Sequence, residues 1–340
     1  MSLLKYIIRR LLIMVPILFG VITLTFILTR LMPGDPVQAL LPINADQDDY
    51  DMLEHALGYD RTPIEQYFIF IGNLFTGNWG ESVSIERNAP VWRLVWDRLP
   101  VTIELAFFSI IIASYLGIKT GKISAKHRNK WQDTVFRGIA LIGVSIPVFW
   151  MGMMVRFVFS NTLGWLPGTG FKSMDYSDPE EFPITGFRLV DALITGNFNI
   201  AIDYLQHLIM PVLCLSFITL ASIVRQNRSS MLEVLEQDYI RTARAKGCRE
   251  KEVINKHALK NALIPTVTII GLNFGSLLGG AILTETTFNL HGLGELIVSA
   301  INQYDYFVIS ATVFFIALIF LAINLFTDLI YAYIDPRIRY

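Results

Sequence analysis

Long apolar runs separated by polar segments are the dominant pattern along the chain. The first run lies within residues 1–30, where Leu11–Thr29 contains no charged side chain. Five further runs lie at about 101–119, 138–156, 207–225, 263–285 and 307–333. A run of about 20 apolar residues is long enough to cross a bilayer as a helix. The pattern therefore predicts an all-α polytopic membrane protein with six transmembrane helices.

The polar segments between these runs differ in length and charge. Residues 31–100 carry eleven Asp or Glu and four Arg, and the segment is long for a simple connection, so we predict a small external lobe. Within this lobe, Asp48–Leu57 and Thr62–Phe75 have the pattern of short helices. Residues 160–206 form a second external insert rich in Gly and Pro, and residues 226–262 form a basic loop.

Basic residues are concentrated in the segments that would face one side of the membrane. The N-terminus, residues 119–137, residues 225–260 and the tail together hold 20 Lys or Arg, whereas the opposite segments hold six. This asymmetry is the positive-inside signal, so we expect both termini and the basic loop to be cytoplasmic. A hydrophobic content of 53% and a mean hydropathy of +0.48 agree with a multi-pass protein. We expect residues 101–340 to form its core domain.

The basic loop carries the most informative pattern in the chain. Nine Lys or Arg lie between Arg225 and Lys260, so this stretch does not cross the bilayer. Small and aliphatic residues nevertheless recur there at helical spacing. Arg244 and Lys246 precede Gly247, as cations do in the last turn before the glycine that ends a helix. We predict a helix, a break at Gly247 and a second helix, which together offer a docking surface for a soluble partner.

The sequence contains no recognisable catalytic or metal-binding motif. Gly117–Ile123 superficially resembles a phosphate-binding loop, but it is one residue short between its glycines and lacks a Ser or Thr after the lysine. The five histidines are scattered without an HExxH pair, and Cys214 and Cys248 share no motif. We expect a non-catalytic chain that holds no metal and no cofactor of its own.

Polar and small residues within the apolar runs have more than one interpretation. Three acids lie near the ends of predicted spans and either stabilise packing or handle substrate: Glu104, Glu285 and Asp328. Polar groups along the fifth run either line a translocation path or bond between helices: Asn273, Ser276, Thr284 and Glu285. The same run has a glycine pattern typical of a packing face: Gly271, Gly275, Gly279 and Gly280. Three prolines are expected to kink or start helices: Pro147, Pro211 and Pro265.

Several segments carry a resemblance to a known family. Asp238–Gly247, with the sequence DYIRTARAKG, is followed by His257–Pro265, and the two resemble the cytoplasmic EAA loop of ABC importer permeases. The similarity is to the dipeptide, oligopeptide and nickel branch, and it is closest to the dipeptide permease type. Lys260 stands where the wider family has proline, a departure that this branch commonly shows. Further matching segments run from near the start to near the end: Pro33–Pro36, Leu163–Pro167, His207–Pro211, Arg228–Leu235, Leu283–Thr286, Gly292–Gly294 and Asp335–Arg339.

The resemblance implies a type I ABC importer permease fold with six spans and a division of labour among subunits. Such a permease pairs with a second homologous permease around the translocation path, while two cytosolic ATP-binding subunits dock beneath and hold ATP and Mg. An external solute-binding protein delivers substrate, membrane lipid surrounds the pair, and no nucleic acid is involved. The resemblance assigns ATPase coupling to Asp238, Tyr239, Arg241, Thr242, Ala243, Arg244, Ala245, Lys246 and Gly247.

The resemblance also implies a substrate class and a location. It indicates import of di- or oligopeptides across a prokaryotic cytoplasmic (inner) membrane, with nickel, glutathione or other small solutes as alternatives within the family. An ion-coupled secondary transporter is a competing hypothesis, but the repeated halves and midplane acids that it requires are not evident in the sequence. An intramembrane hydrolase would need a nucleophile and a base at suitable spacing, and we find no such pair.

Overall fold

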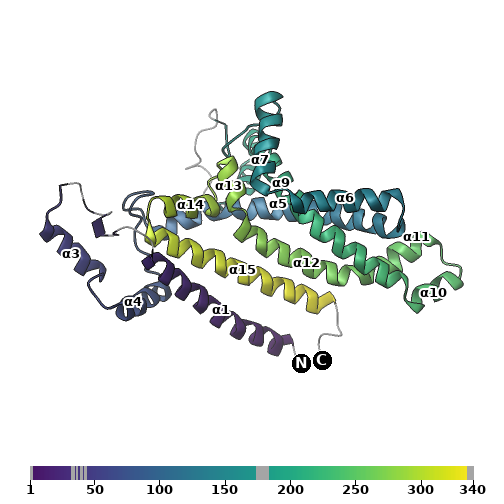
Figure 1. Ribbon diagram of the computed structural model, residues 1–340, viewed down its shortest axis with the longest axis horizontal. Helices are drawn as coiled ribbons and strands as arrows, with labels where there is room; N and C mark the ends of the chain where they lie inside the picture. The colour runs from purple at the N-terminus through teal and green to yellow at the C-terminus, as the bar shows by residue number, and fades with distance from the viewer. Residues whose placement is uncertain are drawn as a thin grey trace.

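The chain folds into an elongated helical bundle in a computed structural model (Figure 1). The structure describes residues 3–31, 35, 37–38, 41, 44–173 and 184–334. Within these ranges the regular secondary structure is helical, apart from an isolated bridge between Glu81 and Pro90. Of the segments that carry the family resemblance, Pro33–Pro36 lies outside the described residues except for Asp35, and Asp335–Arg339 lies entirely outside them.

The described part of the chain contains five helical segments that are long and apolar enough to cross a membrane. They are α1 (Leu3–Leu31), α5 (Val91–Lys126), α9 (Phe198–Leu235), α12 (Leu259–Gly280) with the turns before it, and α15 (Tyr306–Ile334). A bent pair adds a sixth if it counts as one span: α6 (Trp131–Ser145) with α7 (Val148–Arg156) and the π-helical turn η1 (Phe157–Thr162). The prediction of an all-α polytopic membrane fold is confirmed.

The predicted third span at 138–156 is not one straight helix. The axes of α6 and α7 meet at 100°. Ile146 is extended (φ −90°, ψ 126°) because the residue before a proline avoids the helical region, and Pro147 has no N–H with which to continue α6. As a result, α7 projects sideways from the bundle (Figure 1). Pro211 and Pro265 instead lie within the continuous helices α9 and α12.

Other predicted spans have different ends in the structure. Helices α5 and α9 extend beyond the runs at 101–119 and 207–225, because hydropathy marks the part of a helix that suits lipid rather than where its hydrogen bonds stop. The last part of the insert 160–206 therefore belongs to α9, which follows the short helix α8 (Arg188–Ile194). The run at 263–285 is divided between α12 and the short helix α13 (Ile282–Phe288), and a second short helix, α14 (Leu293–Asn302), follows.

Helices α5 and α9 form the most extensive helix pair and the centre of the bundle. A Cβ added at Gly117 would lie 2.7 Å from the Ile223 side chain, and one added at Gly121 would lie 3.0 Å from the Asn227 side chain. These two glycines let the helices approach closely. Their spacing on α5 therefore serves helix packing, which accounts for the superficial likeness to a phosphate loop.

The predicted glycine face of the fifth run is partly confirmed. A Cβ at Gly271 would overlap the side chain of Thr327 on α15, and one at Gly275 would lie 3.1 Å from Phe320 on the same helix. At Gly279 an added Cβ would meet nothing within 4 Å. Close packing of α12 on α15 thus depends on Gly271 and Gly275.

Two helices of the N-terminal polar segment form as predicted. They are α3 (Gln47–Leu57) and α4 (Pro63–Thr76). Each begins with a reciprocal capping box, at Asp46 and at Thr62, and each ends at a glycine with positive φ. Because these signals lie within a few residues of each helix end, the sequence alone located both helices.

A buried carboxylate ties this segment to the membrane bundle. Asp305 lies between α14 and α15 and is 0% exposed. Its Oδ2 accepts hydrogen bonds from Ser82 Oγ at 2.6 Å and from the backbone N–H groups of Val83 and Ser84 at 2.9 and 3.1 Å. The loop before α5 is thereby held against the start of α15.

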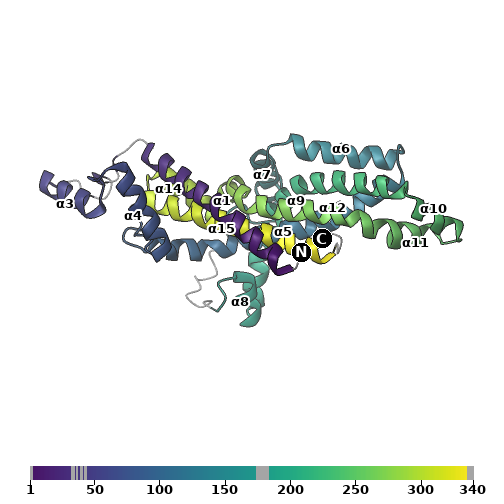
Figure 2. The same cartoon turned by 90° about the horizontal axis from the view of Figure 1, so that it is seen from below.

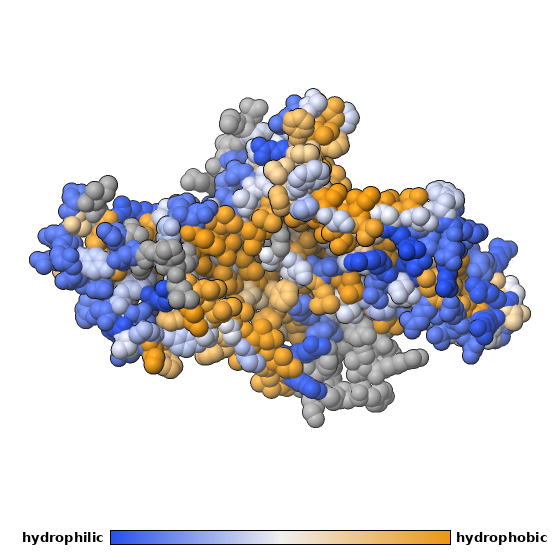
Figure 3. Space-filling model, in the orientation of Figure 1, coloured by the Kyte–Doolittle hydropathy of each residue, from blue (hydrophilic) through white to orange (hydrophobic). Residues whose placement is uncertain are grey.

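Apolar side chains form a broad band across the middle of the molecule (Figure 3). Hydrophilic residues gather at one end, over α3 and α4, and at the other end, over α10 (Asp238–Ala245) and α11 (Glu250–Glu252). The start of α1 and the end of α15 lie side by side (Figures 1 and 2), where Arg10 pairs with Asp328 at 3.1 Å. A bundle with such a band is suited to a bilayer.

Candidate functional site

The basic loop folds into a helical hairpin that projects from one end of the bundle (Figure 1). Helix α10 ends before Gly247, whose φ is 81°, and α11 then leads through the π-helical segment η2 (Val253–Ala258) into α12. The predicted order of helix, break at Gly247 and second helix is confirmed.

Gly247 ends α10 in a Schellman arrangement. Its N–H donates to the Arg244 carbonyl at 2.9 Å, and the Cys248 N–H donates to the Ala243 carbonyl at 3.2 Å. A Cβ at Gly247 would meet nothing within 4 Å, so the site has room for a side chain. The requirement for glycine therefore comes from the left-handed backbone conformation alone.

An ion pair spans the glycine turn. Arg244 Nε and Nη2 donate to the two carboxylate oxygens of Glu250 at 3.1 and 2.9 Å. Hydrogen bonding to Glu250 holds the pKa of Arg244 above its ordinary value, so the guanidinium stays charged at physiological pH. Because both side chains are about half exposed, the pair contributes on the order of 1 kcal/mol or less to stability, and its main effect is to orient the turn.

The underside of α10 is buried against the ends of membrane helices. Ile240 is 0% exposed and Ala243 is 9% exposed. They share an apolar cluster with residues of α5, α9, η2 and α12: Ala125, Met231, Val253, Ile254, Ala258 and Ala262. This shared core fixes the hairpin to three long helices at once.

Two side-chain hydrogen bonds add to this attachment, and sequence reasoning missed both. Asn261 Nδ2 donates to the Tyr239 hydroxyl at 2.6 Å, and Lys122 Nζ donates to Asn255 Oδ1 at 3.0 Å. The partners are 22 and 133 residues apart in the chain. No local pattern indicates such pairs, because the first joins α12 to α10 and the second joins α5 to η2.

A bidentate ion pair fixes the turn between α5 and α6 to α9 and was also missed. Arg228 Nε and Nη2 donate to the two oxygens of Asp133, each at 2.7 Å. Asp133 is 1% exposed and also accepts hydrogen bonds from Ser124 Oγ and the Asn129 N–H. Planar, bidentate geometry of this kind gives a strong and directional contact.

Eight of the nine predicted coupling residues are exposed on the hairpin, and Ala243 is the exception because it lies on the buried underside. The exposed residues are Asp238, Tyr239, Arg241, Thr242, Arg244, Ala245, Lys246 and Gly247. Three of them are basic and one is acidic. The hairpin thus presents a short, polar and net-positive helix on a fixed base.

The four polar residues predicted along the fifth run do not come together in one place. Ser276 is exposed on α12, whereas Asn273 Nδ2 donates to Ser222 Oγ of α9 at 2.7 Å. Thr284 and Glu285 lie on α13 and are 1% and 0% exposed. Of these four residues, Ser276 is therefore the one whose side chain is exposed.

Glu285 is an internal anchor among three helices. Its Oε1 accepts a hydrogen bond from Thr102 Oγ1 of α5 at 2.8 Å. Its Oε2 accepts from the backbone N–H groups of Gly294 and Glu295 at 2.7 and 3.2 Å, where α14 begins. These bonds favour the packing interpretation of this acid.

Glu104 also has the surroundings of a packing residue. Its side chain is 5% exposed and accepts hydrogen bonds from the Tyr204 hydroxyl and from a backbone N–H of α8.

In the described ranges of the chain, no group of three or more His, Cys, Asp or Glu side chains is placed to hold a metal ion. Cys214 is buried and Cys248 is partly buried, and both are free thiols. In the described ranges the geometry offers an exposed polar hairpin on a bundle of long apolar helices.

Comparison with known proteins places the chain in a family. The family described as "Binding-protein-dependent transport system inner membrane component" matches residues 109–340, and the model of its N-terminal region matches residues 3–106. The chain is 45% identical to the dipeptide transport system permease protein DppB of Alkalihalophilus pseudofirmus over 340 residues, which cover 99% of this chain and 100% of the relative.

Two other relatives match over almost their whole length. The di/tripeptide transport system permease protein DppB of Pseudomonas aeruginosa is 40% identical over 338 residues, which cover 99% of each chain. The glutathione transport system permease protein GsiC of Escherichia coli is 38% identical over 337 residues, again 99% of each chain. The chain therefore belongs to the binding-protein-dependent transport system inner membrane components, as a multi-pass, non-catalytic permease subunit of an ABC importer.

Proposed function

We propose that this chain forms half of the translocation path of an ATP-driven importer of di- or oligopeptides, and that it couples to two cytosolic ATPases through residues 238–247. The α10 hairpin carries the coupling proposal, because it is an exposed polar helix on a base shared with three long helices. ATP and Mg would be held by the ATPase partners, and this chain would supply neither catalytic residues nor a cofactor.

The attachment of the hairpin suits the transmission of a force. Ile240 and Ala243 are packed into the same apolar cluster as the ends of α5, α9 and α12. Protein interiors are close-packed and resist compression, so a displacement of α10 would move these helix ends with it. An ATPase that bound the exposed side of α10 and moved on binding ATP would thereby displace α5, α9 and α12 together.

The topology that we propose has six spans with both termini in the cytoplasm. The charge asymmetry supports it, because the basic segments include the α10 hairpin at one end of the apolar band. The contact between Arg10 and Asp328 supports it as well, since it places the start of α1 beside the end of α15. The bent pair of α6 and α7 with η1 would then count as the third span.

A second permease would find an apolar surface on the bent pair. Leu141 on α6 is 68% exposed, Trp150 on α7 is 47% exposed, and Phe157 at the start of η1 is 58% exposed. Since α7 projects sideways at 100° to α6, it would reach into a neighbouring subunit rather than along its own bundle. We propose that Asn273 and Ser276 face the path between the two permeases, whereas Thr284 and Glu285 act by holding α13 in place.

The substrate proposal rests on the relatives. Dipeptide and di/tripeptide permeases match at 45% and 40% identity, whereas the glutathione permease matches at 38%. Glutathione, nickel complexes and other small solutes remain the alternatives within the family. Helices α3 and α4 of the acidic segment at 31–100 are the surface on which we expect an external solute-binding protein to dock, because they lie at the opposite end of the band from α10.

The coupling proposal is tested by purifying the tagged chain from its native membrane and quantifying its partners by mass spectrometry. Arg241 is a suitable target because its side chain is 74% exposed. Reversing its charge in Arg241→Glu should lower ATPase recovery by about tenfold while leaving a second permease bound, since loss of an interfacial charge pair commonly costs that much. Arg93→Glu, at the opposite end of the bundle, is the matched control and should leave ATPase recovery unchanged.

Equal ATPase recovery from Arg241→Glu and wild type would refute docking at α10. Recovery of the chain alone, under conditions that keep other complexes intact, would refute its stable assembly with a second permease and ATPases. The substrate is tested separately by competing uptake of a labelled dipeptide in whole cells with unlabelled tripeptide, glutathione or a nickel chelate. Stronger competition by glutathione than by the peptides would overturn the peptide assignment.

A further inference from the structure

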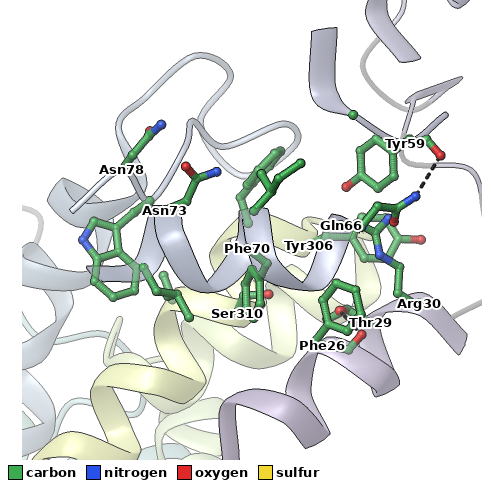
Figure 4. Close-up of a pocket in the computed structure, with 16 residues that line it drawn as sticks. Phe26, Thr29, Arg30, Tyr59, Gln66, Phe70, Asn73, Asn78, Tyr306 and Ser310 are labelled. Atoms are coloured by element: carbon green, nitrogen blue, oxygen red, sulfur yellow. Dashed lines mark hydrogen bonds between the residues drawn. The ribbon is translucent and has the colours of Figure 1, made fainter. Parts of the chain in front are cut away.

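A cavity of about 180 Å³ lies where α4 crosses the end of α1 and the start of α15 (Figure 4). Phe26 and Arg30 of α1 line one side of it, and Phe70 and Asn73 of α4 line another. Aromatic rings and amide or hydroxyl groups alternate along its wall, and none of its sixteen lining residues is Asp or Glu. The cavity therefore suits a ligand that is partly apolar and not cationic.

Two donors face this cavity. The Arg30 guanidinium lies 4.2 Å from the centre of the Tyr59 ring and 5.2 Å from that of Phe26. Tyr306 is 8% exposed, and its hydroxyl is buried without a hydrogen-bond partner in the described part of the chain. A buried hydroxyl with no partner is destabilising, so a ligand oxygen at this position would be favoured. Together a guanidinium and an unsatisfied hydroxyl indicate an anionic oxygen ligand.

An open apolar groove follows α1 towards the same place. It is lined along one face of the helix by Val15, Pro16, Phe19, Gly20, Thr23, Leu24 and Ile27. Ile27 precedes Arg30 by three residues, so the two lie on the same face. From Val15 to Ile27 the helix rises about 18 Å, close to the roughly 15 Å depth of one leaflet of the hydrocarbon core. Within the apolar part of α1 only 17% of residues are buried, so this groove is open to lipid.

We propose that the cavity binds the phosphate of an anionic glycerophospholipid at Arg30 and Tyr306, with one acyl chain in the α1 groove. The position fits a lipid, because Arg30 is the last residue of the apolar span of α1, and basic residues at the end of a span lie near the phosphates of the bilayer. The charge of the site favours an anionic lipid, because Arg30 carries the one formal charge among the lining residues. Asp35 lies near Tyr306, but its oxygens accept hydrogen bonds from the Tyr50 hydroxyl and the Val37 N–H.

Helix α4 has the amphipathic character expected beside such a lipid. Ile64, Phe68 and Phe75 are 70%, 67% and 68% exposed and lie on one face, away from the cavity-lining residues Phe70 and Asn73. An exposed apolar face on a short helix at the end of the span is typical of a helix that lies in the bilayer interface. The lipid would then join α4 to α1 and α15 and so steady the external segment against the bundle.

The test uses the whole detergent-solubilised importer, stripped of lipid and titrated with phosphatidylglycerol while bound lipid is counted by native mass spectrometry. Arg30→Gln should weaken the tightest site by about tenfold, and Tyr306→Phe by about fivefold, as loss of a charged and of a neutral hydrogen bond predicts. Arg93→Gln removes an equal charge outside the cavity and should bind like wild type.

Gly20→Leu tests the groove separately. An added Cβ there meets nothing within 4 Å, so the larger side chain would fill the groove without disturbing the fold. Gly20→Leu should lower the affinity for long-chain phosphatidylglycerol by about threefold, since part of the buried acyl surface is lost, and should leave the affinity for glycerol phosphate unchanged.

Unchanged phosphatidylglycerol affinity in both Arg30→Gln and Tyr306→Phe would overturn the proposal. Equal affinity of the wild type for phosphatidylcholine would overturn the choice of an anionic lipid. Displacement of bound phosphatidylglycerol by a dipeptide, but not by excess phosphatidylcholine, would instead assign the cavity to substrate.

Discussion

Substitutions at Gly247 test whether the α10 hairpin depends on one left-handed residue. Its φ of 81° and the open space around its missing Cβ mean that a side chain there is opposed by backbone conformation alone. In the left-handed region, replacing glycine by a residue with a Cβ raises the conformational free energy by roughly 1–2 kcal/mol. The increase is smaller for asparagine and larger for a β-branched residue. We therefore expect Gly247→Asn, Gly247→Ala and Gly247→Val to loosen the hairpin increasingly in that order.

The size of the effect follows from the local equilibrium between the closed and open hairpin. A cost of 1–2 kcal/mol multiplies the open fraction by about 5–30. In Gly247→Ala, the N–H of Cys248, which donates to the Ala243 carbonyl, should exchange with deuterium faster by that factor. Transport-coupled ATP hydrolysis by the whole importer in proteoliposomes should fall in the same order as exchange rises, while membrane insertion stays normal.

The control is Gly138→Ala, because an added Cβ at this helical position on α6 meets nothing within 4 Å. It should leave both exchange and hydrolysis unchanged. Equal exchange rates in wild type and in all three Gly247 variants would refute the requirement for a left-handed residue. Faster exchange with unchanged hydrolysis would refute the role of the hairpin in coupling, and would leave the backbone argument intact.

Two further substitutions test the packing of the bundle. Gly271→Ala should lower the free energy of unfolding by about 1–3 kcal/mol, because the added Cβ would overlap a side chain of α15, and the melting temperature of the purified complex should fall accordingly. The control Gly138→Ala should stay within about 0.5 kcal/mol of wild type by the same measurement. Asp305→Asn should lower the free energy of unfolding by about 2–3 kcal/mol and speed limited proteolysis of the Ser82–Ile85 loop, because that loop loses a charged hydrogen-bond acceptor. In the control Asp97→Asn, whose carboxylate is 63% exposed, the loop should be cleaved at the wild-type rate.

Elements whose signals are local could be predicted from the sequence. Asp46 and Thr62 are the N-caps of helices α3 and α4, each with its capping partner three residues later, and each helix is followed by a glycine. The α10 hairpin is another such element, because cations and Gly247 mark the end of its first helix. In these places the residues that determine the structure are also neighbours in the chain.

Features that depend on distant partners could not be predicted. The 100° bend at Pro147 is one, since proline permits a kink, a break or, as at Pro211, a continuous helix, and the surrounding packing decides among these. The ion pair of Asp133 with Arg228 is another, because its members lie 95 residues apart. Hydropathy located every apolar run, but it did not separate α13 from α12, because Ala281, Ile282 and Leu283 continue the apolar run of α12 into the first turn of α13.

The distribution of polar groups within the bundle bears on how a peptide would be selected. A carboxylate in a bilayer needs partners, and Glu285 has three donors while Glu104 has two. These bonds hold helices together, so the structure favours a packing role for both acids over contact with a peptide. Of the four candidates on the fifth run, Ser276 stays exposed, and it is neutral. We infer that a path lined by such groups would accept peptides of differing charge, so that selection among substrates would fall to the external binding protein.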